Sequence, residues 1–174
     1  EFLDQRTFGG MQICDRDQDG LPVAVSRIAR DPFDPLFDVD RFFEMLRKRS
    51  IEVKKGLLDQ HLISGIGNIY ADECLWRVGL DGRTPCNRLD RSTAMEIVTT
   101  VTRVMREAFD VGGTSFDALY VNVNGESGYF SRSLAVYGRE GRPCDRCGDP
   151  ITRSKFMNRS SFHCTTCQPP WSLP

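Results

Sequence analysis

Four cysteines near the C-terminus constrain the fold of this chain more than any other feature of its 174 residues. They form two pairs, Cys144-x2-Cys147 and Cys164-x2-Cys167, with sixteen residues between the pairs. Each C-x2-C pair lets two thiolates from one tight turn reach the same ion, and two such pairs close a tetrahedral site that has no open position for chemistry. The spacing therefore predicts one structural zinc ion (Zn2+) bound by these four cysteines.

Disulfides or a redox-active pair are the alternative interpretations of these cysteines. The chain has seven cysteines, an odd number, and Cys14, Cys74 and Cys86 are scattered singly. No signal peptide is visible and no stretch approaches the ~18 apolar residues of a membrane span, so nothing indicates an oxidising compartment. We therefore favour metal binding, give the three single cysteines no role, and expect no membrane partner.

The residues between the two cysteine pairs predict a β-hairpin. Strand-forming residues stand on both sides of a basic turn at 155–159. These strand formers are Ile151, Thr152, Phe156, Ser161 and Phe162. A zinc-pinned hairpin that presents basic residues follows from this pattern.

Charge is distributed unevenly along the chain, although its net value is only −1. Residues 1–40 carry nine acids and four bases, whereas residues 41–55 carry six bases and two acids. Residues 139–159 carry six bases and three acids. Two local basic patches can bind phosphates while the whole protein stays near neutral, so the net charge does not exclude nucleic acid as a partner.

Helices are predicted for most of the region between residues 39 and 109. The pattern of apolar residues, caps and prolines gives helices over roughly 39–48, 53–60, 68–77 and 92–109. Phe42, Phe43 and Leu46 would face the core from the first of them. The longest carries apolar residues at spacings of three and four, namely Ile97, Val101, Val104, Met105 and Ala108, which predicts a core-facing stripe. Gly112-Gly113 is expected to end this helix.

Two segments beside these helices have the composition of binding loops. Gly65-Ile-Gly-Asn68 precedes a helix, whose free N–H groups and dipole attract anions, and Asn68 adds a side-chain donor. The turn alone predicts phosphate binding only weakly, but the basic cluster upstream and Arg159 support it. The long polar segment 114–129 is either a substrate loop or a plain surface connection.

Three parts of the sequence invite comparison with known proteins. They are LLDQHLISGIGNIYADECLW at 57–76, the stretches YGREGRPC at 137–144 and KFMNRSSFHC at 155–164, and DQRTFG at 4–9. In this order they resemble the helix-two-turns-helix signature, the zinc finger, and the strand closing the N-terminal domain of the formamidopyrimidine-DNA glycosylase family. The resemblance implies a mainly α fold with a small β part: a helix-two-turns-helix domain and a four-cysteine zinc-finger hairpin, preceded by a remnant strand of an N-terminal β-sandwich.

The resemblance also implies roles for individual residues. Asn68 and Arg159 would hold the phosphates that flank a lesion, with Gly67 in the same turn. Arg159 would also donate a proton in δ-elimination, as the catalytic residue of this part of the protein. Lys54 and Arg49 would join the phosphate-binding group.

Further implied contacts lie outside the predicted helices. Phe8 would fill the space left by an extruded base, and Arg6 would read the orphaned cytosine. Residues 114–130 would close over the damaged base. The family's nucleophile is an N-terminal proline followed by glutamate, whereas this chain starts Glu1-Phe2-Leu3. We therefore expect a fragment that lacks the N-terminal catalytic domain and is inactive alone.

The expected organisation has four parts. They are the end of the catalytic domain and a linker (1–30), the helix-two-turns-helix domain (31–130), the zinc-finger hairpin (131–168) and a frayed tail (169–174). An apolar face around Phe2, Phe8 and Met11 would favour self-association of the fragment, although the parent is expected to be a monomer. The resemblance implies a bacterial, cytoplasmic, nucleoid-associated protein.

The expected function is that of the DNA-binding part of a base-excision-repair glycosylase and abasic-site lyase, which removes 8-oxoguanine and formamidopyrimidines from damaged double-stranded DNA. One alternative is the endonuclease VIII branch, which removes oxidised pyrimidines, although the long loop favours the purine branch. The others are a zinc-ribbon module that binds damaged DNA without cutting it and a zinc-stabilised protein-interaction domain.

Overall fold

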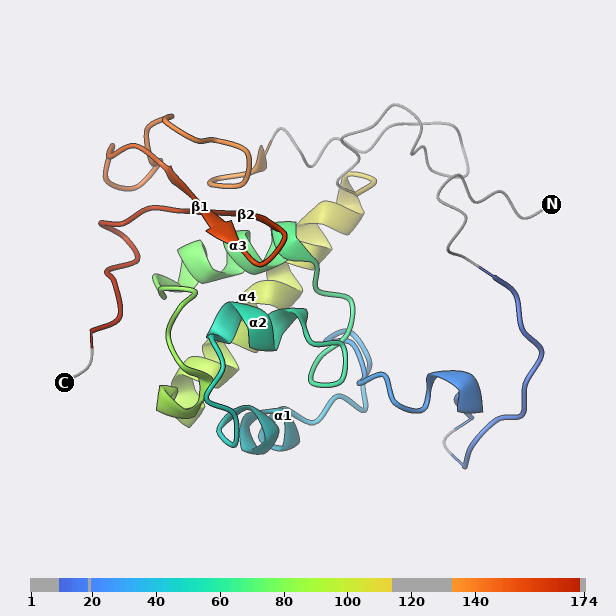
Figure 1. The fold of residues 1–174 in the computed structure, drawn as a ribbon. Coiled ribbons are helices and arrows are strands. Elements are labelled where there is room, and N and C mark those ends of the chain that lie inside the picture. The colour runs from blue at the N-terminus through green and yellow to red at the C-terminus, as the bar shows by residue number, and fades with distance from the viewer. Residues whose placement is uncertain (1–9, 19, 114–132, 173–174) are drawn as a thin grey trace.

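The computed structural model describes residues 10–18, 20–113 and 133–172, and helices dominate these ranges. Figure 1 shows a helical body with a two-stranded hairpin beside α3. In the described part the elements are η1 (Val23–Val25), α1 (Val39–Leu46), α2 (Val53–Leu58), α3 (Asn68–Val78), η2 (Cys86–Arg88), α4 (Arg91–Asp110), β1 (Thr152–Phe156) and β2 (Arg159–His163). Phe2, Arg6, Phe8 and the predicted lesion loop at 114–130 lie outside the described residues.

The four predicted helices are confirmed, with ends that differ from the prediction by one or two residues. Local side chains explain the boundaries. Asp38 accepts a hydrogen bond from the N–H of Arg41 at 3.0 Å and begins α1, and Asp90 accepts one from the N–H of Thr93 at 2.7 Å and begins α4. Gly79 ends α3 in the left-handed conformation, with φ 76°.

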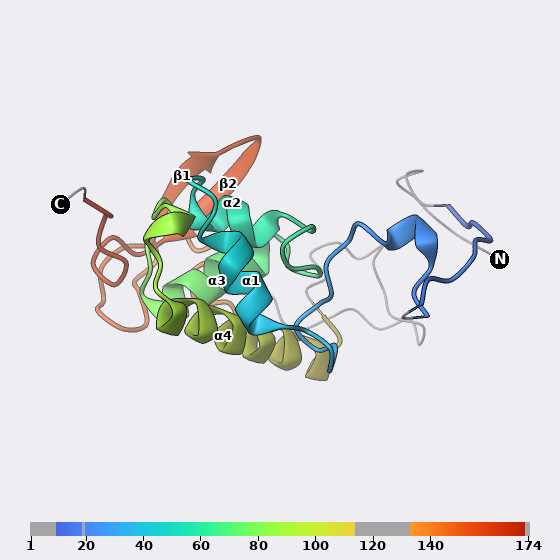
Figure 2. The ribbon, with the colours of Figure 1, turned by 90° about the horizontal axis from the view of Figure 1, so that it is seen from below.

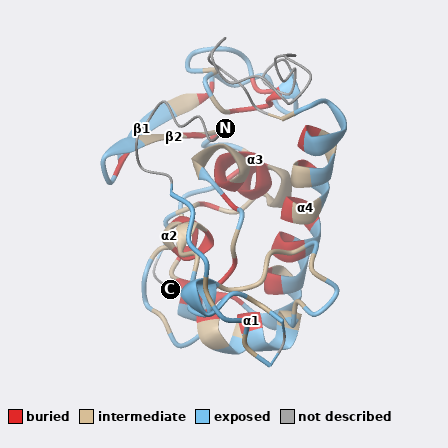
Figure 3. Cartoon of the chain, turned by 90° about the vertical axis from the view of Figure 1, so that its right-hand side faces the viewer, coloured by how far each residue is buried: buried red, intermediate tan, exposed pale blue. Residues whose placement is uncertain are grey.

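The main core lies between α4 and the other three helices. The predicted stripe of α4 is confirmed, since four of its five residues are buried and Met105 packs against the core. Figure 3 shows this as buried positions along the side of α4 that faces α3. Phe42 and Leu46 are buried as predicted, and Phe43 packs against them half-buried. The core therefore fixes α3 against the longest helix.

Helix α3 is enclosed on nearly every side. Six consecutive residues, Ala71–Trp76, are buried, so the helix has no broad solvent-facing stripe. One side packs on α4, and the other meets the segment 134–168, which we call the C-terminal module (Figure 2). Trp76 belongs to a second core with residues of this module: Ala135, Val136, Cys144, Ile151, Phe162 and Cys164. Helix α3 is thus the element on which the two parts of the molecule meet.

The predicted hairpin is confirmed. Strands β1 and β2 pair antiparallel, and Phe156 faces Arg159 at the closed end. The turn consists of Met157 and Asn158, and Met157 adopts a positive φ of 51°. The basic residues of the turn region therefore stand at the tip of the hairpin.

The two ends of the described chain differ in their contacts. Residues 10–13 form no strand, and Met11 is 80% exposed. At the other end, Gln168 and one residue of the expected tail contact the body of the molecule. Gln168 is buried and donates to the carbonyl of Leu80 at 3.0 Å, and the N–H of Trp171 donates to Asp81 at 3.0 Å. No helix within the described ranges is both long and apolar enough to cross a membrane.

Candidate nucleic-acid interface and metal centre

The four predicted ligands form a cluster that can hold a metal ion. The sulfur atoms of Cys144, Cys147, Cys164 and Cys167 all lie within 4.8 Å of one another. The Cys144–Cys167 and Cys147–Cys164 sulfurs are 3.8 and 3.4 Å apart, close to the separation of about 3.7 Å that a tetrahedral ion with bonds of about 2.3 Å requires. All seven cysteines are free, so the disulfide alternative does not hold.

Groups around Cys144 favour the thiolate form of this one ligand. Burial alone would raise the pKa of Cys144, but the backbone N–H groups of Arg146 and Cys147 and the indole of Trp76 lower it to about 6. The Trp76 Nε1–H lies 3.4 Å from the Cys144 sulfur. Such outer hydrogen bonds orient the ligands of a metal site, and here one of them comes from α3.

The metal cluster is also tied to the C-terminal end of α3. The guanidinium of Arg146, which lies between the first two cysteines, donates to the carbonyls of Trp76 at 2.7 Å and Arg77 at 2.8 Å. It also lies 4.1 Å from the ring of Trp76. A cation at this position satisfies carbonyls that a helix end leaves without partners. The cysteine knuckle therefore caps the helix.

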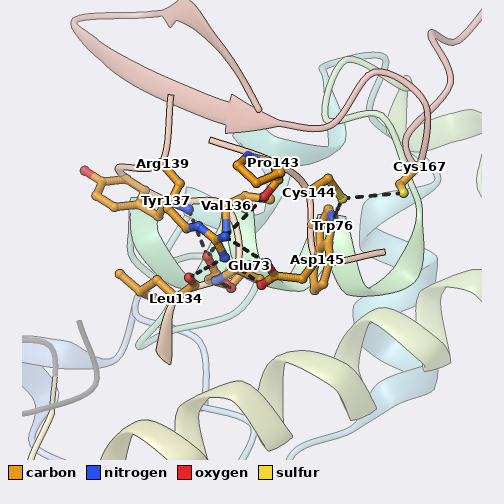
Figure 4. A network of polar contacts seen from close by, with 11 residues as sticks. Glu73, Trp76, Leu134, Val136, Tyr137, Arg139, Pro143, Cys144, Asp145 and Cys167 are labelled. Carbon is orange, nitrogen blue, oxygen red and sulfur yellow. Dashed lines mark hydrogen bonds and ion pairs between the residues drawn. The ribbon is translucent and has the colours of Figure 1, made fainter. Parts of the chain in front are cut away.

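A buried carboxylate holds the first residues of the C-terminal module (Figure 4). Glu73 on α3 is fully buried and accepts three backbone hydrogen bonds, from the N–H groups of Ala135 at 3.0 Å, Val136 at 2.9 Å and Tyr137 at 2.9 Å. Nearby, Arg139 makes a two-point contact with Asp145, at 2.6 and 2.7 Å. These contacts fix the segment that follows residues 114–132.

The predicted anion turn stands at the N-terminus of α3. Gly67 is the N-cap residue and has extended backbone angles, and a side-chain carbon built there would meet nothing within 4 Å. Gly65, in contrast, has φ 81° and needs the freedom of glycine. No acidic residue stands in the first turn of α3 to compensate its dipole. The turn is therefore open and electrically suited to an anion.

Asn68 connects this turn to the hairpin. Its Nδ2 donates to the carbonyl of Ser160 at 2.9 Å, across 92 residues of sequence. The amide has a second N–H, which this bond leaves for another acceptor. Arg159 directly precedes Ser160 and is exposed, and its Nε lies 3.5 Å from the Oδ1 of the neighbouring Asn158. The structure thus joins Asn68 to the strand residue next to Arg159, and the roles of both residues at a phosphate stay predictions.

Two other predicted phosphate contacts have protein partners. Lys54 is 1% exposed, and its Nζ lies 2.6 Å from Asp72 in a buried ion pair, so its place in the phosphate-binding group stays a prediction. Arg49 is partly exposed and pairs with Asp59 at 2.6 Å. Its role at a phosphate stays a prediction.

Comparison with known proteins decides the family. Residues 28–119 match the formamidopyrimidine-DNA glycosylase H2TH domain, which is the helix-two-turns-helix domain. The formamidopyrimidine-DNA glycosylase of Streptomyces coelicolor is 57% identical over 169 residues, which cover 97% of this chain and 59% of that protein. The chain belongs to the formamidopyrimidine-DNA glycosylase family. A second family member, from Mycolicibacterium smegmatis, is 55% identical over 99% of this chain and 62% of its own length.

Solved structures of the family agree. The MutM (Fpg) protein of Thermus thermophilus superposes with a TM-score of 0.76 at 36% identity, over 82% of this chain and 54% of that one. The Lactococcus lactis Fpg, in complex with DNA that contains an abasic site, superposes with a TM-score of 0.76 at 33% identity, over 83% of this chain and 52% of that one. The chain spans about three-fifths of the length of the curated family members.

Sequence reasoning missed three residues of α3 that organise this family member: Asp72, Glu73 and Trp76. Each bonds to a segment 60 to 90 residues away. Two adjacent acids inside an otherwise buried helix were the available signal, because charged residues are rarely buried without partners.

Proposed function

We propose that the chain is the DNA-binding part of a glycosylase and abasic-site lyase that removes oxidised purines, 8-oxoguanine and formamidopyrimidines, from double-stranded DNA. On its own it binds duplex DNA without releasing a base. The observation that carries this proposal is the hydrogen bond from Asn68 to Ser160, which holds the exposed Arg159 beside the open N-terminus of α3.

The two residues offer complementary contacts to a DNA backbone. The N-terminus of α3 supplies N–H groups and a favourable dipole, and Asn68 adds its second amide N–H. Arg159 supplies a planar guanidinium that can grip a phosphate through two parallel bonds. Two such neighbouring contacts suit phosphates on either side of a displaced nucleotide.

The metal in this proposal is one Zn2+ ion held by Cys144, Cys147, Cys164 and Cys167. With four thiolate ligands it has no open position and supplies shape only. The thiolates, the indole of Trp76 and the guanidinium of Arg146 keep the hairpin seated on α3. Arg159 is then the one described residue that we propose for the reaction, as a proton donor in δ-elimination after the family pattern.

The relatives support the substrate class. The Lactococcus lactis Fpg has been solved in complex with DNA that contains an abasic site, and a mutant of it in complex with DNA that contains Fapy-dG. We propose none of the described lysines near Asn68 as the amine that forms the covalent intermediate, because Lys54 is buried against Asp72 and the exposed Lys155, which pairs with Ser160, does not match the N-terminal proline of the family pattern. Binding without excision is therefore the property that we propose for the chain.

Binding and chemistry are tested on the same samples. The chain is mixed with a duplex that carries 8-oxoguanine opposite cytosine, binding is read by gel shift, and borohydride is added to trap any Schiff base. A shifted band without a trapped adduct supports the proposal, whereas an adduct would show that an amine of this chain performs the covalent step. Excision of 8-oxoguanine compared with thymine glycol by the full-length protein separates the purine branch from the endonuclease VIII branch.

Variants test the site itself. Arg159→Ala and Asn68→Ala should each weaken binding by roughly 1–3 kcal/mol, the range for a lost hydrogen bond to a charged group. Arg91→Ala is the matched control, because it removes one exposed cation, paired with Asp40, from α4 and outside both basic patches. Equal affinities of all three variants and the wild type would leave only a protein-interaction or structural role for the module.

A further inference from the structure

A buried ion pair lies beside the proposed phosphate site and joins three elements. Lys54 on α2 and Asp72 on α3 are 1% and 2% exposed, with Nζ and Oδ1 2.6 Å apart. The Lys54 ammonium also lies 4.4 Å from the ring centre of Phe156 on β1. Removing two charges from water is costly, and a pair of apolar side chains often gives equal or greater stability. The pair therefore calls for an explanation other than stability.

The remaining bonds of Asp72 go to the hairpin. Its Oδ1 accepts from the hydroxyl of Ser161 at 3.1 Å, and its Oδ2 accepts from the backbone N–H of Phe162 at 2.9 Å. Asn68, one helical turn earlier on the same face of α3, holds the carbonyl of Ser160. Three successive residues of β2 are thus fixed to one face of α3, and Arg159 is the residue immediately before them (Figure 1).

We propose that Asp72 is a positioning residue for DNA binding, which together with Asn68 sets the place of Arg159 relative to the N-terminus of α3. This inference rests on the proposed function. Lys54 is the counter-ion that allows the Asp72 carboxylate to hold β2 close to the DNA backbone. Without Lys54 the negative charge of Asp72 would repel the phosphates that Arg159 attracts. Lys54 thus acts on DNA through Asp72 and does not touch it.

The geometry explains why a carboxylate stands at position 72. A carboxylate offers two oxygens and can accept from a hydroxyl and a backbone N–H at once. Both donors come from β2, so the contact fixes the orientation of the strand about its own axis as well as its distance from α3. A hairpin held only at its metal-bound base would leave its tip free to pivot, and a displacement of about 1 Å at a binding group is enough to lose much of its effect.

A double variant removes the pair without leaving a lone buried charge. Lys54→Met with Asp72→Ala deletes both acceptors for β2. Lys54→Met with Asp72→Asn is its conservative partner, because the asparagine oxygen can still accept from the Phe162 N–H and its amide can donate to Ser161. Each is compared with Arg159→Ala and combined with it. Binding to a duplex with a stable abasic-site analogue is measured by fluorescence anisotropy, and zinc content and circular dichroism are checked for every variant.

Positioning predicts a specific pattern of coupling. The Met/Ala variant should weaken binding roughly tenfold in the wild-type background but less than about twofold when Arg159 is already alanine, because the two changes remove the same contact. The Met/Asn variant should restore affinity to within about threefold of the wild type. A purely structural role would give either no loss or equal losses in both backgrounds.

The outcomes separate this inference from the proposed function. If Arg159→Ala and Asn68→Ala weaken binding while the Met/Ala variant does not, or does so equally in both backgrounds, the positioning role is wrong and the proposed function stands. If the Met/Ala variant does not fold, the Met/Asn variant tests the proposal instead. A tenfold loss of DNA affinity in a Met/Asn variant with native zinc content would show that the charge of Asp72, and not the position of β2, affects binding, and the positioning role would be wrong. If the wild-type chain does not bind, both are wrong.

Discussion

Replacing Glu73 should destabilise the chain by an amount that depends on how many backbone bonds the new side chain keeps. Its Oε1 accepts from Val136 and Tyr137, and its Oε2 from Ala135. In Glu73→Gln the amide oxygen can take the place of Oε1, so only the Ala135 N–H loses its acceptor and faces an NH2 group. One buried donor without a partner costs about 1–3 kcal/mol.

Glu73→Ala removes the acceptor of all three N–H groups. Three lost bonds set an upper limit near 9 kcal/mol, but the segment can shift and admit water, so we expect about 3–5 kcal/mol. Glu107→Gln is the control, because its carboxylate pairs with Arg77 of α3 and is 43% exposed. A partly exposed ion pair of this kind should contribute less than about 1 kcal/mol to the free energy of unfolding.

The assay is urea unfolding of the zinc-loaded chain, with amide hydrogen exchange at residues 135–137 read in parallel. The expected order of stability is wild type, Glu107→Gln, Glu73→Gln and Glu73→Ala, with faster exchange at 135–137 only in the two Glu73 variants. Stabilities of the two Glu73 variants within about 0.5 kcal/mol of the wild type would refute the reasoning, because this is the scatter of ordinary surface substitutions.

Three other predictions follow from the described contacts. Removing the metal with a chelator should abolish DNA binding and change the fluorescence of Trp76, whose indole contacts Cys144, while most of the helical circular dichroism signal remains. Unchanged DNA binding by the metal-free protein would contradict the zinc assignment. In thermal unfolding, Gly56→Ala should cost about 1–3 kcal/mol through overpacking, since the added carbon would lie 2.9 Å from the Cys86 sulfur. Gly67→Ala meets nothing within 4 Å and should cost below about 1 kcal/mol, because alanine is only a poorer N-cap residue than glycine. Although burial opposes it, hydrogen bonds from Arg83 and Trp171 lower the pKa of Asp81 below its usual 3.8, so the stability that its charge contributes is present above that pH and is lost as pH falls through the lowered pKa. In urea unfolding, the difference in stability between the wild type and Asp81→Asn should therefore shrink below pH 3.8. A difference that stays constant with pH would exclude this contribution.

The parts of the fold that sequence predicted are those set by local spacing. The cysteine pairs specify the metal cluster because two residues between thiols suit one ion. The stripe of α4 specifies a buried face because its period matches that of the helix.

The environment of single charged residues was harder to predict. Lys54 and Lys55 are adjacent in sequence, yet Lys54 is buried against Asp72 and Lys55 pairs with Glu52 at the surface. Which of the two points inward depends on the face of α2 that meets α3 and the hairpin. The direction of each side chain is set by tertiary packing and cannot be predicted from the composition of residues 41–55. The same holds for Arg49 and its partner Asp59.

The capping of α3 by Arg146 has a consequence for the order of events during synthesis. The helix leaves the ribosome well before the residues that hold it: Arg146 follows Trp76 by 70 positions, and Ser160 follows Asn68 by 92. Until then Asn68 and Glu73 lack their partners from the C-terminal module, and contacts of such separation form late because long loops must close first. A chain interrupted before Ala135 would expose a helix with an unsatisfied carboxylate at Glu73 and with apolar side chains, which is a ready target for chaperones and proteases.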